Sequence, residues 1–247
     1  MVKLTKRMQA VADMVTAGNR LADVGTDHGY VPIALVQRGI VPYAIAMDIN
    51  PGPLQRATDN IKRNDLEAQI TTRLCDGLTA LKPGDADSIL IAGMGGELTL
   101  HILKEGDAVC RQAKELILQP QSDIYKVRYY LREHDLAIVD ENMVLEDGKY
   151  YPMMRVMPGA DTSFWKQVDP QVAEVCDIYG PLLLKNGHPV LRKYLVKEHK
   201  LLLNLLKGLD QQEPTDKVVV RRGEIAEKLA HNEAAYTILG DLIHAGI

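Results

Sequence analysis

The sequence predicts an α/β fold, in which a mostly parallel seven-stranded sheet ends in an antiparallel hairpin and is followed by an α-helical, coiled-coil-like domain. Three observations support this prediction. Short apolar segments alternate with segments of helical periodicity from residue 20 to residue 133, a pattern typical of parallel sheets covered by helices. Two strand-like segments then flank the turn residues 146–149. From residue 158 onward helical periodicity dominates.

The expected strands are apolar, often β-branched runs bounded by turn-forming residues. They cover residues 20–24, 43–48, 69–74, 86–92, 114–119, 136–145 and 150–157. Helical patterns in the same region cover residues 4–15, 30–38, 51–63, 97–103 and 124–133. Longer helices are expected at 168–179, 190–209 and 222–245, and residues 217–220 could form a short strand. We therefore expect a first domain at residues 1–159 and a helical domain at residues 160–247.

Composition and cysteine usage narrow the class of protein. Of the 247 residues, 46% are hydrophobic and 25% are charged, which is ordinary for a globular protein with a substantial core. Cys75, Cys110 and Cys176 form no CxxC pair, which favours reduced thiols over a disulfide framework or a metal site. The chain shows neither an apolar signal segment nor the roughly 18 consecutive apolar residues of a membrane span. We expect a cytoplasmic protein without bound metal or membrane anchor.

Basic residues gather in the C-terminal helices although the net charge of the chain is −4. Residues 185–228 contain ten basic and six acidic residues. This excess fits either a solvated helical surface or a surface that contacts RNA phosphates. A third possibility is an arm that stabilises the fold or a dimer. Phosphate contacts would be made by Arg192, Lys193, Lys197, Lys200, Arg221 and Arg222.

The loop after the first expected strand has the chemistry of a cation-binding site. Gly25 permits a tight turn, and Asp23 can accept hydrogen bonds from an ammonium group. Asp27 stands where a dinucleotide-binding loop has its second glycine, and a carboxylate there would repel a pyrophosphate. S-adenosyl-L-methionine carries an ammonium and a sulfonium and no phosphate. On charge alone, this loop favours S-adenosyl-L-methionine over NAD.

The other expected strand ends carry matching residue types. Ligands of open parallel sheets bind beyond the carboxyl ends of the strands. Asp48 is placed to bind ribose hydroxyls, and Asp76 with Gly77 could meet an adenine amino group. The end of the fourth strand, residues 92–96, is mostly bare backbone and would face the transferred group. Two simpler interpretations stay open: His28 could be a loop residue without a chemical role, and residues 93–96 could form only a tight turn.

Several motifs together resemble the bacterial tRNA (adenine-N1)-methyltransferases that modify position 22, the TrmK family. They are Asp-Val-Gly-Thr-Asp-His-Gly-Tyr-Val-Pro at 23–32, Ala-Met-Asp-Ile-Asn at 46–50, Ala-Gly-Met-Gly-Gly at 92–96 and Tyr-Gly-Pro-Leu-Leu at 179–183. The opening Leu-Thr-Lys-Arg at 4–7 fits as well, so the resemblance extends over nearly the whole chain. It implies a class I, Rossmann-like methyltransferase domain with a helical coiled-coil-like domain, S-adenosyl-L-methionine as cofactor and tRNA as partner.

Position by position, the resemblance implies roles for the strand ends. The methionine side of the cofactor would be lined by Asp23, Gly25, Asp27, His28 and Tyr30. The ribose and adenine would be held by Asp48, Ile49 and Asn50, with Asp76 and Gly77 at the adenine. Between cofactor and substrate would lie Ala92, Gly93 and Met94. The chain departs from many relatives at Gly29 and from some at Ala92, and neither change alters a charged contact.

The chemistry of the implied substrate suggests how the residues act. Adenine N1 has a lone pair and no hydrogen, so it can attack the sulfonium methyl directly and no general base is obligatory. The enzyme then contributes positioning and electrostatics. We expect Asp27 to stabilise the growing charge near the exocyclic amine, Tyr30 to position the base, and Arg7 to contact phosphate or substrate. Met94 would either touch the substrate or pack beneath the loop.

Alternative functions remain at this point. The chain could methylate another RNA, a protein or a small molecule, although the basic tail and the open glycine-rich strand end disfavour the last two. It could be a non-catalytic RNA-binding scaffold, but passive binding does not require Asp27 and Asp48 together. A nicotinamide-dependent dehydrogenase is disfavoured by the absence of a Gly-x-Gly-x-x-Gly loop. We expect the protein to act as a monomer.

Overall fold

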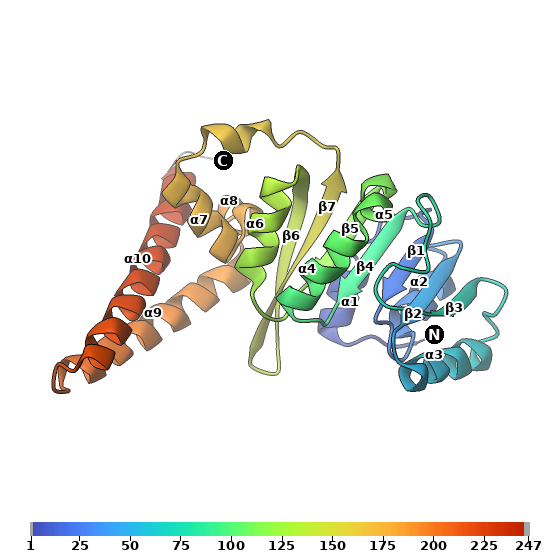
Figure 1. Cartoon of the computed structure of the whole chain (residues 1–247), viewed down its shortest axis with the longest axis horizontal. Helices are drawn as coiled ribbons and strands as arrows, with labels where there is room; N and C mark the ends of the chain where they lie inside the picture. The colour runs from blue at the N-terminus through green and yellow to red at the C-terminus, as the bar shows by residue number, and fades with distance from the viewer. Residues whose placement is uncertain (1, 245–247) are drawn as a thin grey trace. The chain divides into compact units, whose positions relative to one another are not determined.

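One seven-stranded sheet forms the centre of the first compact unit, with the strand order β3-β2-β1-β4-β5-β7-β6 (Figure 1). The computed structural model describes residues 2–244. Its strands are β1 (Leu21–Val24), β2 (Ala44–Asp48), β3 (Ile70–Leu74), β4 (Ser88–Ala92), β5 (Glu115–Gln119), β6 (Leu136–Glu146) and β7 (Lys149–Pro158). The pairs among β1 to β5 are parallel, whereas β7 runs antiparallel to β5 and β6. The predicted mixed sheet is confirmed.

Helices cover both faces of the sheet (Figure 1). They are α1 (Lys6–Ala12), α2 (Tyr30–Gln37), α3 (Pro51–Arg63), α4 (Gly96–Glu105), α5 (Asp107–Gln112) and α6 (Ile124–Glu133). Side chains alternate between the faces of a strand, so neighbouring residues of β1 enter different cores. Leu21 joins the buried cluster of α1, α2 and α3, which includes Val11. Ala22 joins the cluster of α4, α5 and α6, which includes Leu131.

The carboxyl ends of the central strands lie level with one another. Val24 at the end of β1 is opposite Met47 of β2 and Ile91 of β4. Ala92 at the end of β4 is opposite Gln119 at the end of β5. The loops that leave these strands therefore start at the same edge of the sheet.

The hairpin between β6 and β7 closes as its sequence predicts. Glu146 pairs with Lys149 across the turn, and the two residues between them have positive φ angles. These are Asp147, with φ 48°, and Gly148, with φ 75°. Positive φ at both central residues is the requirement of the type I′ turn that joins tight antiparallel strands.

The first helix is shorter than its periodicity predicts. The helix α1 ends at Ala12, not at residue 15. Beyond it, the backbone N–H and hydroxyl of Thr16 donate to the buried carboxylate of Glu115, at 2.8 and 2.7 Å. This contact with a distant strand takes the place of the helical hydrogen bonding that the apolar pattern alone indicated. The short helix α5 was not predicted, since six residues are too few to show periodicity.

A second compact unit begins at Trp165, a few residues after the boundary expected from the sequence. A 3₁₀ helix at Ser163–Gln167 spans the division. The unit contains α7 (Pro170–Tyr179), α8 (Pro181–Lys185), α9 (Pro189–Asp210) and α10 (Asp216–His244). In Figure 1 the helices α9 and α10 run side by side as a long hairpin. The predicted long helices are confirmed up to residue 244, and the predicted end at residue 245 lies outside the described residues.

The strand that residues 217–220 could form is not present, because these residues lie within α10. Their β-branched side chains favour a strand, but in α10 the hydroxyl of Thr215 accepts a hydrogen bond from the backbone N–H of Val218 at 3.4 Å. The segment lies in the first turns of the long helix α10, where Val219 and Val220 are exposed. The continuous helix overrides the local β propensity of these residues.

A buried polar network connects the helices of the second unit. Asn232 of α10 is 0% exposed and donates to the Glu198 carboxylate of α9 at 2.9 Å. The hydroxyls of Tyr179 and Tyr194 donate to the same carboxylate, each at 2.7 Å. Burial beside this charge raises the pKa of Tyr179, so its hydroxyl stays protonated as a donor. Such a network fixes the register of three helices whose apolar faces alone could slide.

Candidate active site

The loop after β1 is held in a compact conformation by its backbone. Gly25, Asp27 and Gly29 have φ angles of 72°, 52° and 70°. The N–H of Thr26 donates to the carbonyl of Met47 at the end of β2, at 2.8 Å. A Cβ atom on Gly25 would lie 2.2 Å from Cε of Met94. Glycine at 25 therefore suits the positive φ of this turn and leaves room for the end of the Met94 side chain from the loop after β4.

Asp23 provides a buried carboxylate at the base of this loop. It is 6% exposed and accepts a hydrogen bond from the Thr26 hydroxyl at 2.6 Å. Burial raises its pKa from 3.8 to about 6; the Thr26 hydrogen bond opposes this rise, and the charge of Asp48 adds to it. A carboxylate in this position gains most from a cationic ligand, because the cation would offset the cost of burying a negative charge.

Asp48 is the second buried carboxylate at this edge. It is 8% exposed, and its Oδ1 accepts from the backbone N–H of Asn50 at 2.9 Å. Its Oδ2 lies 3.4 Å from the backbone N of Asp27, which connects the ends of β1 and β2. The adjacent side chain of Ile49 is 56% exposed and offers an apolar surface beside the acid.

The carboxylate of Asp27 already has partners within the protein, which the sequence did not suggest. Its carboxylate forms an ion pair with the guanidinium of Arg56 on α3 at 2.6 Å, and its other oxygen lies 3.4 Å from Nε2 of His28. The ring of His28 stacks on Tyr30 with centroids 5.2 Å apart. Tyr30 is 37% exposed at the start of α2. The predicted residues of this loop are thus brought together, and Arg56 is a partner that sequence reasoning missed.

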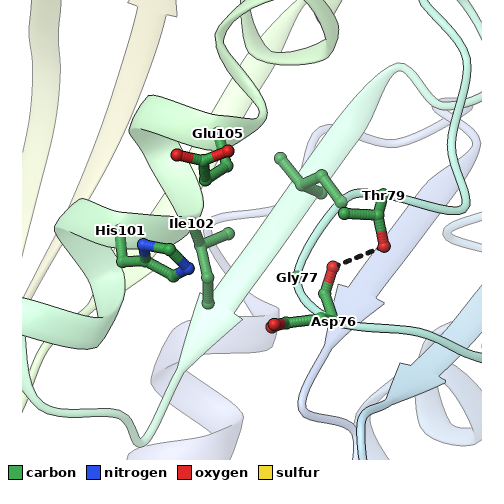
Figure 2. A pocket seen from close by; sticks show the side chains of 7 residues that line it. Asp76, Gly77, Thr79, His101, Ile102 and Glu105 are labelled. Atoms are coloured by element: carbon green, nitrogen blue, oxygen red, sulfur yellow. Dashed lines mark hydrogen bonds between the residues drawn. The ribbon is translucent and has the colours of Figure 1, made fainter.

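A cavity of about 110 Å³ lies between the loop after β3 and helix α4 (Figure 2). Asp76 and Gly77, which were predicted to bound an adenine, line one side. Figure 2 shows His101 and Glu105 on the side of α4 that faces this loop. These two residues were not predicted, although their spacing of four places them on one helix face. The cavity therefore has polar groups from both walls.

The end of β4 is joined to the end of β5. The N–H of Gly93 donates to the carbonyl of Gln119 at 3.0 Å, and the N–H of Gln121 donates to the carbonyl of Met94 at 2.8 Å. The hydroxyl of Ser122 accepts from the N–H of Gly96 at 3.3 Å. The Gln-Pro-Gln-Ser segment at 119–122 is a polar run directly after a buried strand, and this signal was overlooked in the sequence.

Arg7 lies at this same place, although it comes from α1. Its Nη1 donates to Oε1 of Gln119 at 2.7 Å, and its guanidinium lies 5.4 Å from the ring centre of Tyr151. A Cβ atom on Gly93 would lie 3.5 Å from Nη1 of Arg7 and 3.7 Å from Nε2 of Gln121. The expected position of Arg7 beside the carboxyl edge is consistent with these contacts, and Gln119, Gln121 and Tyr151 are additional residues there.

Met94 packs against the buried core beneath α4 and α6. Its methyl group occupies the space over Gly25. This corresponds to the simpler of the two interpretations of Met94, in which the side chain supports the loop.

The basic residues of the second unit fall into two groups. Lys193, Lys197, Lys200 and Lys207 are exposed and recur at helical spacing, so they form a stripe along one face of α9. Arg221 and Arg222 are instead paired with Glu224 at 2.6 Å and Asp210 at 2.7 Å. Arg192 donates to the carbonyl of Gly187 at 3.1 Å. Exposed positive side chains are therefore gathered along one face of α9, which we call the α9 lysine stripe.

Two further observations concern the described residues. Between residues 2 and 244, no helix is long and apolar enough to cross a membrane. In the same part of the chain, no group of three or more His, Cys, Asp or Glu side chains is arranged to hold a metal ion.

Comparisons with known proteins identify the family. A family described as methyltransferase domain matches residues 4–154. The tRNA (adenine(22)-N(1))-methyltransferase of Bacillus subtilis (strain 168) is 32% identical over 228 residues, covering 92% of this chain and 94% of the relative. The chain belongs to the tRNA (adenine(22)-N(1))-methyltransferase family.

Solved structures of this family share the fold. The crystal structure of the B. subtilis M1A22 tRNA methyltransferase TrmK aligns with a TM-score of 0.83 and 31% identity, over 95% of this chain and 99% of that one. A putative tRNA (m1A22) methyltransferase from Streptococcus pneumoniae, in complex with S-adenosyl-L-methionine, aligns with a TM-score of 0.80 and 32% identity, over 94% and 99% of the two chains. The class I methyltransferase fold predicted from the motifs is confirmed.

Proposed function

We propose that this protein transfers the methyl group of S-adenosyl-L-methionine to N1 of adenine 22 in tRNA. One observation carries the proposal: two buried carboxylates lie at the same edge of the sheet as the glycine-rich end of β4. Asp23 and Asp48 suit the cationic and hydroxyl groups of the cofactor, whereas Gly93 leaves space for a flat base. Family membership supplies the nucleotide and its position.

The residues at this edge of the sheet fit the chemical groups of the cofactor. Asp23 would receive its ammonium group, and Asp48 with Ile49 and Asn50 would hold the ribose and one face of the adenine. The cavity at Asp76 and Gly77 would take the adenine edge. When bound, S-adenosyl-L-methionine supplies a methyl group activated by a sulfonium. The remaining predicted cofactor contacts are Gly25, Asp27, His28, Tyr30, Ala92, Gly93 and Met94.

The protein's part in the transfer is to orient the base and to stabilise charge. With the cofactor bound, adenine N1 would donate its lone pair to the activated methyl carbon, the carbon–sulfur electron pair would leave with sulfur, and the adenine would gain the positive charge. Asp27 would stabilise this charge, and its existing pairing with Arg56 means that it acts within a local ion pair. Tyr30 would position the base, Met94 would support the loop beneath it, and Arg7 would contact the substrate.

Methylation assays with labelled S-adenosyl-L-methionine test the function. Incubation with tRNA transcripts should give 1-methyladenosine at position 22, and a transcript with guanine at this position should stay unlabelled. Nucleoside analysis identifies the product, and primer extension locates it. Label found only in protein or in small molecules would exclude the proposal in favour of a methyltransferase with another substrate.

The α9 lysine stripe is proposed as the main tRNA contact of the helical unit. Each Lys–phosphate contact releases counterions, so affinity depends on salt concentration. Replacing Lys193, Lys197 and Lys200 by Gln should raise the Kd for tRNA roughly tenfold at 0.15 M salt and reduce the slope of log K against log salt by about 2 to 3. Filter binding at several salt concentrations measures both quantities.

A matched control removes the same charge elsewhere. Lys62, Lys82 and Lys149 are exposed residues of the first unit, and their replacement by Gln should leave the slope nearly unchanged. Arg192, Arg221 and Arg222 are proposed as weaker contacts, since existing hydrogen bonds and ion pairs engage them. Equal losses in the stripe and control variants would reject the stripe as a binding surface.

We also propose that the protein acts as a monomer in the cytoplasm, without a metal ion.

A further inference from the structure

The space above Gly93 is bounded by two side chains that come from different parts of the sequence. A Cβ atom on Gly93 would lie 3.5 Å from Nη1 of Arg7 and 3.7 Å from Nε2 of Gln121. Gly93 itself has a φ of 82°, so a side chain at this position would strain the backbone, whereas glycine leaves the strand end bare. A base that approaches the bare end of β4 would therefore meet these two groups at its edge.

The side chains of Arg7 and Gln121 differ in the contacts that they already make within the protein. Arg7 is held by its hydrogen bond to the fully buried Gln119 and by its contact with the ring of Tyr151. Gln119 uses its own amide nitrogen on the carbonyl of Pro120 at 3.3 Å. Gln121 is exposed, and within residues 2–244 its carboxamide has no hydrogen-bond partner. Its backbone is nevertheless fixed, because its N–H donates to the carbonyl of Met94 at 2.8 Å.

The reaction limits which edge of adenine a protein can hold. Since N1 must be free to attack the methyl group, the Watson–Crick edge has to face the cofactor. The polar groups that remain are the N6 amino donor and the N7 acceptor of the Hoogsteen edge, and the N3 acceptor beside the sugar. A carboxamide offers one acceptor and one donor at matching spacing, and bidentate binding of Asn or Gln to adenine N6 and N7 is a recurrent mode of base recognition.

We propose that Gln121 is the residue that reads the target adenine. Its Oε1 accepts from N6–H and its Nε2 donates to N7, which leaves N1 directed at the cofactor. This inference rests on the proposed function. As N1 is methylated, positive charge spreads to the N6 amino group, so the hydrogen bond to Oε1 becomes stronger in the transition state than in the bound substrate. Gln121 therefore acts on kcat more than on KM.

A tRNA transcript with 7-deazaadenosine at position 22 tests the contact, because this base has C–H in place of N7. The wild-type enzyme should methylate it about threefold to tenfold more slowly than adenosine, as expected for one lost hydrogen bond. Gln121→Ala should lose about tenfold or more on adenosine and show no further loss on 7-deazaadenosine. Gln121→Glu should reverse the preference, since a carboxylate repels N7 but still accepts from N6–H.

The controls separate this inference from other causes. Gln112→Ala removes the same side chain from an exposed site on α5, at the opposite edge of the sheet, and should behave as wild type. The affinity for S-adenosyl-L-methionine, measured by calorimetry, should be unchanged in all Gln121 variants. The inference is overturned if Gln121→Ala keeps the full sensitivity to 7-deazaadenosine or turns over adenosine normally. If the wild-type enzyme leaves position 22 unmodified, the proposed function fails instead.

Discussion

Replacing Asp23 by Asn is expected to weaken S-adenosyl-L-methionine binding by about 100-fold, because a desolvated carboxylate that pairs with an ammonium contributes strongly to affinity. The same change should stabilise the protein without ligand. The pKa of Asp23 is about 6 in the folded protein against 3.8 in its ordinary state. Folding therefore strengthens proton binding at this carboxyl, and the ionised form is the one that the fold disfavours.

The sign of the pH dependence follows from this shift. The contribution of Asp23 to the free energy of unfolding is largest below pH 3.8, falls as pH rises to about 6, and is constant above that. At neutral pH the ionised carboxylate costs roughly 3 kcal/mol relative to the protonated form. Asn avoids this cost and can still accept from the Thr26 hydroxyl, so Tm should rise by several degrees.

Calorimetry between pH 5 and 8 checks both parts of the prediction. The wild-type affinity for the cofactor should fall up to tenfold per pH unit below pH 6 and be nearly flat above pH 7. Asp23→Asn should lose this pH dependence. Asp27→Asn is the control for the effect on Tm. Asp27 is half exposed and paired with Arg56, so this substitution should leave Tm nearly unchanged. A lower Tm for Asp23→Asn would refute the conclusion that the buried, ionised carboxylate of Asp23 destabilises the ligand-free protein.

Glu141→Gln is expected to lower the free energy of unfolding of the first unit by about 3–5 kcal/mol. Arg128 of α6 and Glu141 of β6 form an ion pair at 2.9 Å, with side chains that are 1% and 0% exposed. Gln removes the negative charge and leaves the guanidinium buried. The loss of one partner costs more than the pair itself contributes, because the remaining charge keeps its desolvation penalty.

Two variants define what urea unfolding should show. The double variant Arg128→Met/Glu141→Leu replaces the pair with apolar side chains and should recover most of the lost stability. Asp140→Asn, beside Glu141 but 49% exposed and 3.8 Å from Arg155, should cost less than about 1 kcal/mol. If Glu141→Gln were as mild as Asp140→Asn, the buried pair would not be a major determinant of stability.

The sequence predictions were accurate for elements that neighbouring residues specify, and they failed where other parts of the structure decide the conformation. The strands of the sheet were predicted to within two residues, because a run such as Ile89–Ile91 is apolar throughout and buried on both faces. The hairpin was predicted from its turn residues. The end of α1 was wrong because Thr16 contacts Glu115, which is 99 residues away. The strand expected at 217–220 was wrong because the segment begins the long helix α10, whose buried residues, such as Ile225 and Ala235, lie further along the chain.

The sequence by itself determined the sheet, the family and the chemistry of the cofactor loop, because each is encoded in contiguous residues. The order Asp-x-Gly-x-Asp after a buried strand specifies both a tight turn and a negative site. Only the tertiary structure decided which side chains lie around Gly93, where we propose that the target base binds. Arg7 reaches Gln119 across 112 residues of sequence, and Gln121 meets Gly93 only because β4 and β5 end level. Such contacts depend on how strands pair and helices pack, and no local pattern records them.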